Sequence, residues 1–411
     1  MMYRLACLSL LYASLAVAAP TWLQFRGPNG SGIAEAKNMP THWSEDKNIA
    51  WKTEIPGRGH SSPVIDGDQV WLTTAIDVPT PQADRKERLK TNTGNQPLIV
   101  SDSVQFFAIC IDRKSGKIVQ NIELMRENKP QWVHELNSYA TPSPILRDSK
   151  LFCHFGTFGN ACVDTKSGKV LWTNRELRIM HENGPGSSPE LWGNRFLVVC
   201  DGSDAQFVAG LDTDTGKVAW KTPRSGEMHD NPQLQKAYGT PLMIDHGGQP
   251  QLISPGANWL YSYDPASGRE LWKLKYGLLG FSNISRPVYA DSMIYASTGF
   301  MRGELLAVRF EDGQPTIAWR KKKGVGKSPS PLVVGKRLYL MGDKDIVTCL
   351  NAKTGDELWQ ARLSGKFSAS PTLIGGHIHV TNTEGLTTVF ADADAFTQVT
   401  QNQLDGNVMA S

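Results

Sequence analysis

The strongest acid–base candidate in this 411-residue sequence is the neighbouring pair His181 and Glu182. Imidazole titrates near neutral pH, so a positioned histidine can take up and release a proton there. The pair belongs to a larger set of polar residues in the stretches that lead into Ser/Thr-Pro steps: Arg58, His60, Asn137, Tyr139, His181, Glu182, Asn183, Asn283, Arg286 and Lys327. Gathered at one place, such groups suit a small polar or anionic ligand. The alternative is that they bond neighbouring loops to one another, and we predict no catalytic residue among them.

Other motifs of catalysis or metal binding are incomplete in the sequence. Residues 324–328 (GVGKS) end like a phosphate-binding loop, but that motif needs a glycine five residues before its Gly-Lys pair, where Lys321 stands. The metalloprotease HExxH, the hydrolase GxSxG and the kinase motifs are absent. No two cysteines are spaced as CxxC. We therefore predict no metal site.

Two cysteines, Cys153 and Cys162, flank a glycine-rich turn at 156–159. A hairpin centred there would bring them opposite one another, close enough for a disulfide. The alternative is packing alone, because Cys162 shares its repeat position with Cys110 and Cys349, where Gly210 and Ser262 also occur. That position requires a small residue in either case.

Two sequence elements alternate along the chain at a spacing of about 40 to 50 residues. The first is the Ser/Thr-Pro step followed by an apolar run, at Pro63, Pro144, Pro189, Pro241, Pro287 (preceded by Arg286), Pro331 and Pro371. The second is Asp or Asn, then Ser/Thr-Gly, then a tryptophan four residues later, complete at Trp172, Trp220, Trp272 and Trp359 and weaker at Trp319. Trp51 stands near the N-terminus in a similar outer-strand sequence.

Both elements have a physical role in short strands. Proline lacks an N–H and opens a strand more readily than it continues one. The Asp side chain bonds backbone N–H groups two residues on, and glycine accepts a positive φ, so the second element is a hairpin turn. The tryptophan that follows is large enough to fill the space between neighbouring sheets. The pattern predicts an all-β propeller of four-stranded antiparallel blades, whose first strands line a central channel.

The blade count follows from the two ends of the repeat. Residues 47–55 read as an outer strand without inner strands before it, and 408–411 resemble the start of another repeat. We expect eight blades in one domain over 20–411, with the last blade truncated and closed by 47–55; seven blades are the alternative. Residues 77–103 form a polar insertion in the first full blade, typical of a solvated loop, with a short helix as the alternative over 85–90.

The first 19 residues are typical of a secretory signal peptide: Arg4, an apolar run and small residues at 16–19. The run is too short to span a bilayer, so we expect a periplasmic or secreted protein without a transmembrane segment. The formal net charge of +3 gives no sign of a nucleic-acid partner.

The Asp-x-x-Thr-Gly-Lys-x-x-Trp repeats resemble those of the PQQ-like β-propellers, which include quinoprotein alcohol dehydrogenases and the propeller lipoprotein of outer-membrane assembly. Residues 25–30, 137–140, 181–189 and 280–283 resemble most closely exported propellers of planctomycete-type bacteria. The chain lacks the adjacent cysteine pair of the dehydrogenases, a block matching their calcium ligands and catalytic Asp, and the lipid-attachment cysteine of the assembly protein.

The resemblance and the missing catalytic set together favour a non-catalytic binding or scaffold module that uses the channel-mouth face. Its partner would be a protein or a small polar ligand, and no cofactor is expected. The alternative is a quinoprotein-like oxidoreductase that holds PQQ with calcium in the channel.

Overall fold

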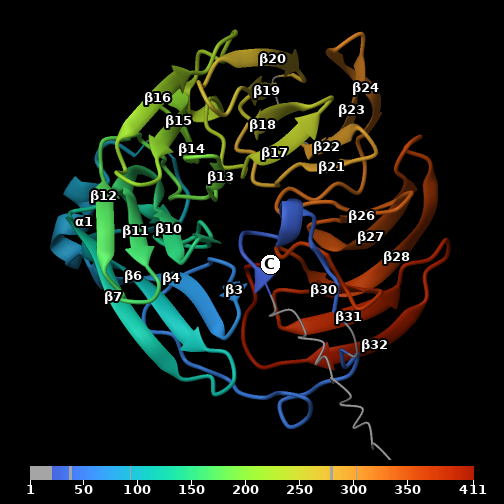
Figure 1. Cartoon of the computed structure of the whole chain (residues 1–411), viewed down its shortest axis with the longest axis horizontal. Helices are drawn as coiled ribbons and strands as arrows, with labels where there is room; N and C mark the ends of the chain where they lie inside the picture. Colours follow the sequence, from blue (N-terminus) through green and yellow to red (C-terminus); the bar gives the residue numbers. More distant parts are fainter. Residues whose placement is uncertain (1–20, 37–38, 93, 278–280, 302) are drawn as a thin grey trace, which may run out of the picture.

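Four-stranded antiparallel sheets follow one another around a central axis in the computed structural model (Figure 1), which describes residues 21–411 except 37–38, 93, 278–280 and 302. The predicted signal peptide at 1–19 lies outside the described residues. In each blade the first of the four strands lies toward the axis and the fourth lies at the rim. The all-β propeller fold is thus confirmed.

The described residues form seven complete blades, numbered here in chain order. Blade 1 has β3 (Val64–Asp66), β4 (Gln69–Pro79), β6 (Ser101–Asp112) and β7 (Ile118–Asn128). Blade 2 has β9 (Ile145–Arg147), β10 (Lys150–His154), β11 (Asn160–Asp164) and β12 (Val170–Asn174). Blade 3 has β13 (Glu190–Trp192), β14 (Arg195–Asp201), β15 (Gln206–Asp212) and β16 (Val218–Pro223). Blade 4 has β17 (Leu242–His246), β18 (Gln249–Pro255), β19 (Trp259–Tyr263) and β20 (Glu270–Lys275).

The remaining blades complete the series. Blade 5 has β21 (Val288–Ala290), β22 (Met293–Ser297), β23 (Leu305–Glu311) and β24 (Gln314–Lys321). Blade 6 has β25 (Leu332–Val334), β26 (Arg337–Met341), β27 (Lys344–Asn351) and β28 (Glu357–Lys366). Blade 7 has β29 (Thr372–Ile374), β30 (His377–Thr381), β31 (Leu386–Ala391) and β32 (Gln398–Gln403). Among the residues described, no helix is long and apolar enough to cross a bilayer.

Short elements lie outside the blades. β1 (Thr21–Trp22) pairs with β3, and β2 (Ile33–Ala34) runs parallel to β29. The polar insertion holds the exposed helix α1 (Gln82–Arg88) and β5 (Leu98–Ile99), which pairs with β8 (Val133–His134). The 3₁₀ turns are η1 (Pro28–Gly30), η2 (Gly156–Phe158) and η3 (Pro232–Leu234). The insertion therefore contains a helix, the less favoured of the two readings from sequence.

The repeat residues have similar contacts in most blades. In the turn of blade 2, Asp164 Oδ1 accepts the Ser167 N–H at 2.7 Å, and Gly168 has φ of 73°. Trp172 then donates its indole N–H to the Thr213 carbonyl of blade 3 at 2.9 Å. Equivalent bonds run from Trp220 to the Pro265 carbonyl of blade 4 and from Trp359 to the Ala393 carbonyl of blade 7. Trp319 reaches the turn of blade 6, whereas Trp272 bonds to Gln251 of its own blade.

The eighth position of the ring is built differently. Figure 1 shows the blue N-terminal part of the chain running along the rim between blades 7 and 1, away from the C-terminus, which lies at the centre. The predicted outer strand at 47–55 has no ladder partner in the described part of the chain, because no inner strand lies beside it there. Trp51 nevertheless donates its indole N–H to the Arg113 carbonyl of blade 1 at 2.8 Å, as the blade tryptophans do to their neighbours.

The possible Cys153–Cys162 disulfide does not form, and both cysteines are free and buried, as the alternative of packing alone requires. The register pairs Cys153 with Ala161 and Phe152 with Cys162. Successive residues of a strand point to opposite faces, so the two sulfur atoms enter different interfaces between blades. A direct pairing of Cys153 with Cys162 would need the hairpin to be centred on 156–159, but the observed register is shifted by one residue.

Candidate functional site

A ring of hydroxyl groups marks the first residue of each blade around the channel. The backbone N–H of Ser62 donates to Ser143 Oγ at 2.8 Å, that of Ser143 to Ser188 Oγ at 2.9 Å, and that of Ser188 to Thr240 Oγ1 at 2.9 Å. The series continues from Arg286 to Ser330, from Ser330 to Ser370 and from Ser370 to Ser411. Ser411 also accepts a hydrogen bond from Ser62 at its carbonyl. We call these residues the hydroxyl ring: Ser62, Ser143, Ser188, Thr240, Arg286 (by its N–H), Ser330, Ser370 and Ser411.

One side of the hydroxyl ring is filled by the N-terminal segment 23–32, which we call the channel segment. Arg26 is buried there and donates to the carbonyls of Pro331 at 3.1 Å and Pro371 at 3.3 Å. The channel segment is also tied to blade 2 through the Leu23 carbonyl and to blade 7 through the Gly32 carbonyl. It therefore connects blades on opposite sides of the ring (Figure 1, blue strand and turn at the centre).

Arg286, which the sequence placed at the channel mouth, is buried against the channel segment instead. It replaces the ring hydroxyl of blade 5, and its guanidinium donates to Glu190 and, at 2.5 Å, to the Phe25 carbonyl. Both charged side chains are almost completely buried. Burial raises the pKa of Glu190, and the adjacent Arg286 opposes that rise. Glu190 stands where most other blades have an apolar residue after the proline, and Arg286 stands where they have Ser or Thr. These two exceptions to the repeat therefore pair with each other.

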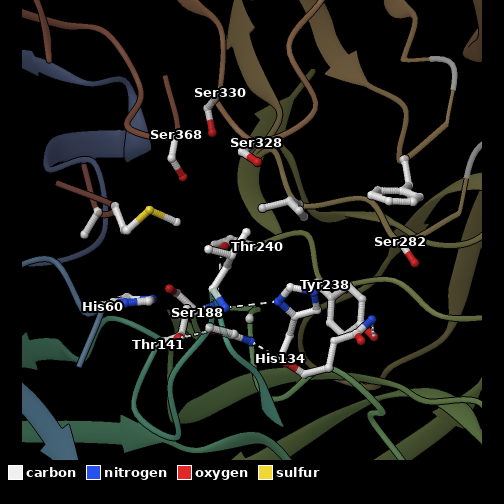
Figure 2. Close-up of a pocket in the computed structure, with 18 of the residues that line it drawn as sticks. His60, His134, Thr141, Ser188, Tyr238, Thr240, Ser282, Ser328, Ser330 and Ser368 are labelled. Carbon is white, nitrogen blue, oxygen red and sulfur yellow. Dashed lines mark hydrogen bonds between the residues drawn. The ribbon is translucent and has the colours of Figure 1, made fainter. Parts of the chain in front are cut away.

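The other side of the hydroxyl ring opens into a cavity of about 560 Å³. Figure 2 shows hydroxyls of the ring, together with His60, His134 and Tyr238, around this space. Phe25 of the channel segment belongs to its lining, as do Lys236, Gln96, Gln233, Phe281 and Phe300. The volume is within the usual range of ligand pockets. We refer to it as the mouth cavity.

Three of the ten predicted site residues line the mouth cavity: His60, Asn137 and Asn183. The two asparagines also join loops. Asn137 donates to the carbonyls of Asn183 at 2.8 Å and Pro185 at 3.1 Å, and Asn183 donates to the Tyr238 hydroxyl at 3.1 Å. Burial, helped by Arg58, lowers the pKa of His60 to about 4, so its imidazole is neutral at pH 7.

The His181–Glu182 pair is not arranged for acid–base chemistry at this cavity. His181 is buried, and burial lowers its pKa to about 3. Its Nδ1 accepts the Gly184 N–H at 3.1 Å, and its ring packs edge-on against Phe158. Glu182 accepts a hydrogen bond from Ser203 at 2.9 Å. Neither side chain lines the cavity, so this pair braces a loop.

The other predicted residues have structural contacts as well. Tyr139 is buried against Phe158, and Asn283 donates to the Gly256 carbonyl at 2.9 Å. Arg58 donates to the Glu135 carbonyl, and the Lys327 ammonium lies 5.2 Å from the centre of the Phe300 ring. Seven of the ten residues are thus outside the cavity lining, because most polar groups at the mouth are used between loops.

Sequence reasoning missed Lys236, Tyr238 and His134. Lys236 and Tyr238 occupy the stretch before Thr240-Pro241, the same place in the repeat from which the other candidates were taken. Lys236 is 4% exposed, and burial lowers the pKa of its ammonium. It donates to Gln233 Oε1 at 2.5 Å. Glutamine cannot neutralise it, and Glu182, whose charge opposes the effect of burial on the Lys236 pKa, is outside the lining. The described residues of the lining include no Asp or Glu.

The lining does not fit PQQ with calcium. Calcium prefers several oxygen ligands that include carboxylates, and none lines the mouth cavity in the described part of the chain. No cluster of three or more His, Cys, Asp or Glu capable of holding a metal occurs among the described residues. The channel itself contains Arg26, Arg286 and Phe25 where a planar cofactor would need space.

Comparisons with known proteins agree with this architecture. A family model described as outer membrane protein assembly factor BamB matches residues 157–316 and 258–408. A curated protein of that name from Legionella pneumophila is 26% identical over 194 residues, which are 44% of this chain and 48% of that protein. The chain spans about half the length of the first curated relatives that it matches.

Two solved structures show the same fold at low identity. BamB from Moraxella catarrhalis superposes with a TM-score of 0.52 and 14% identity, covering 82% of this chain and 92% of that one. Quinohemoprotein alcohol dehydrogenase from Comamonas testosteroni superposes with a TM-score of 0.55 and 13% identity, covering 92% and 77%. One of these two proteins is named as an enzyme and the other is not. The shared fold therefore does not identify the function, which has to be inferred from the site residues.

Proposed function

Because the chain belongs to the propeller family described as outer membrane protein assembly factor BamB, we propose that it is a non-catalytic, extracytoplasmic module that binds another protein at its mouth face. A planctomycete-type origin of the nearest relatives is no part of this proposal. The mouth cavity receives side chains of the partner, and the hydroxyl ring forms its base.

The observation that carries the proposal is the apolar rim of the cavity. Leu136, Ile284 and Phe300 line it and are exposed by 62%, 44% and 50%, and Met301 beside Phe300 is exposed by 63%. Large apolar side chains grouped on a surface and surrounded by polar groups are typical of protein-binding sites. Lys236, buried beside them, is the cation of the lining; Glu182, which lies outside the lining, partly opposes the lowering of its pKa by burial. We expect it to donate a hydrogen bond to an acceptor group of the partner.

Site-specific photo-crosslinking tests the proposal. A photoreactive residue is placed at 136, 284 or 300, and as a control at 119, where Val119 is equally exposed (55%) on the outer strand β7 of blade 1. Cells of the source bacterium then receive the labelled protein in the periplasm. We expect discrete adducts to one protein from the three rim positions and none from 119.

The same adducts from 119, or no adduct from any rim position, would contradict the proposal. Titration with PQQ plus calcium is the second arm. Saturable binding that is lost on replacing Lys236 by Met would support the quinoprotein alternative and oppose a non-catalytic module.

A further inference from the structure

The base of the mouth cavity presents hydroxyl groups whose oxygens already accept hydrogen bonds. Ser143, Ser188, Thr240 and Ser330 line the cavity, and each accepts one backbone N–H at 2.8 or 2.9 Å. All four residues are at most 4% exposed. Among the residues that the structure describes, none of their O–H protons has an acceptor. We call these four residues the donor hydroxyls.

The bonds that the donor hydroxyls accept determine what they can bind. A hydroxyl carries one proton and two lone pairs, and an N–H that donates to its oxygen polarises the O–H bond and makes it a stronger donor. Figure 2 shows Ser188, Thr240 and Ser330 around the same space. A ligand with several acceptor oxygens therefore suits this base better than a ligand that donates hydrogen bonds.

Lys236 adds a positive charge to the same lining. Its ammonium has three N–H groups, of which one donates to Gln233 at 2.5 Å. Glu182 acts on it through its charge, but Glu182 lies outside the lining and accepts its hydrogen bond from Ser203. No second acceptor for the Lys236 ammonium occurs in the described part of the chain. Its remaining N–H groups are available to an acceptor in the cavity.

A further positive charge lies beneath the donor hydroxyls. Arg286 is paired with Glu190, whereas Arg26 donates to backbone carbonyls and has no carboxylate partner among the described residues. Burial and the charge of Arg286 lower the pKa of Arg26 to about 9, so its guanidinium is still charged at pH 7. Phe25, whose carbonyl accepts a hydrogen bond from Arg286, lines the cavity next to them. These cations make the potential at the base of the cavity positive.

Much of the remaining lining is apolar, with Phe25, Phe281 and Phe300 as its aromatic residues other than Tyr238. From the donor hydroxyls, Lys236 and these phenylalanines we propose that the mouth cavity binds a carboxylate attached to an apolar group. The carboxylate oxygens accept from the donor hydroxyls and Lys236, and the apolar group packs on the phenylalanines. One ammonium in the lining balances one negative charge, which favours a carboxylate over a doubly charged phosphate.

This inference rests on the binding function proposed for the mouth face, and it specifies the chemical group that is bound there. The carboxylate belongs either to the partner protein or to a free small molecule. Both sources offer the same group to the donor hydroxyls, so the experiment has to separate them.

The probe is N-acetyl-L-phenylalanine, and the matched control is its carboxamide, which has nearly the same shape without the charge. In calorimetric titration of the full chain in calcium-free buffer, we expect saturable binding of the acid and binding of the amide weaker by about tenfold or more. Lys236→Met should weaken binding of the acid by about tenfold and leave the amide nearly unchanged. Lys114→Met, whose side chain is 70% exposed in the turn between β6 and β7, should change neither.

Thr240→Val tests the donor hydroxyls. Valine has nearly the shape of threonine but no O–H, and it also removes the acceptor of the Ser188 N–H. Thr240→Ser keeps both functions. We expect Thr240→Val to bind the acid about tenfold more weakly and Thr240→Ser to bind it as the unchanged protein does. If Thr240→Val does not fold, the comparison of acid with amide and the Lys236→Met variant still decide the matter.

Competition with crosslinking from position 284 identifies the source of the carboxylate. Loss of the adducts on addition of the acid would assign the carboxylate to the partner protein, and adducts that persist with the acid bound would assign it to a free small molecule. No binding of the acid, equal binding of acid and amide, or an unchanged affinity in Lys236→Met would overturn the proposal. A lack of adducts while the acid still binds would oppose the protein-binding function alone.

Discussion

The two sides of the hydroxyl ring are built from the same inner strands but have opposite character. On one side the channel segment fills the space, and the charges of Arg286 and Glu190 are paired with each other. On the other side the mouth cavity is hollow; Lys236 donates to an amide there, and its nearby carboxylate, Glu182, is outside the lining and is not hydrogen-bonded to it. Buried polar groups that satisfy one another hold a structure together, whereas groups without a charged partner are available to a ligand. We therefore expect the side filled by the channel segment to contribute stability and the mouth cavity to be the side that binds.

Removal of Arg286 should have the largest effect on stability, because it leaves Glu190 buried without its cation. We expect Arg286→Met to lower the free energy of unfolding by about 3–5 kcal/mol, measured by chemical denaturation. The double variant Arg286→Met/Glu190→Met should recover much of this loss. If Arg286→Met cost no more than the double variant, the pair would contribute nothing and the contrast between the two sides would fail.

A methyl group at Gly30 tests how tightly the channel segment is packed. Gly30 has φ of 62°, and a Cβ there would lie 2.1 Å from Cζ of Arg286. Gly67 has φ of 60° with no atom within 4 Å of its Cβ position, so Gly67→Ala measures the cost of the backbone conformation alone. We expect Gly30→Ala to destabilise the protein by about 2 kcal/mol more than Gly67→Ala in thermal or urea unfolding. Equal effects would mean that the segment moves aside freely.

Acid should weaken the protein through His181. Its pKa is about 3 in the folded chain, below the ordinary value of 6.5, because the ring is buried. Between these values the unfolded chain binds a proton that the folded chain does not. Its contribution to stability is therefore complete above pH 6.5 and is lost progressively as the pH falls toward 3.

His181→Asn should reduce this dependence of unfolding free energy on pH by about 1 kcal/mol per pH unit between pH 6 and pH 4. His42→Asn, at an exposed position, is the control and should leave the slope unchanged. If His181→Asn kept the wild-type dependence of unfolding free energy on pH, the loop that contains His181 would open before its imidazole is protonated, and this explanation would be wrong.

The smallest expected change in stability comes from the hydroxyl ring itself, which separates the channel segment from the mouth cavity. Ser330 Oγ accepts the Arg286 N–H at 2.9 Å, so Ser330→Ala should cost about 1 kcal/mol of unfolding free energy. Ser328 lines the same cavity outside the hydroxyl ring, and Ser328→Ala should cost less than about 0.5 kcal/mol. If the two variants were equal, the ring would be a lining of the cavity without a structural role.

The sequence determined the blades, because the information for each is local. The Asp-to-Gly turns and the proline steps act within a few residues, and their repetition gave the propeller, its strand order and the positions of the tryptophans. The choice between a Cys153–Cys162 disulfide and packing alone stayed open in the sequence, because it depended on a single-residue shift in register that turn composition does not specify.

Only the tertiary structure decided which polar residues face the mouth cavity. Arg286, Tyr139 and His181 lie in the same stretches before the prolines as His60 and Lys236, but they face away from the cavity. Arg286 bonds to the channel segment, Tyr139 packs on Phe158, and His181 accepts the Gly184 N–H. The filling of the channel by Arg26 was equally unpredictable, since its carbonyl partners at 331 and 371 are more than 300 residues distant. A repeat fixes what happens inside a blade, whereas the use of the channel depends on contacts among all blades at once.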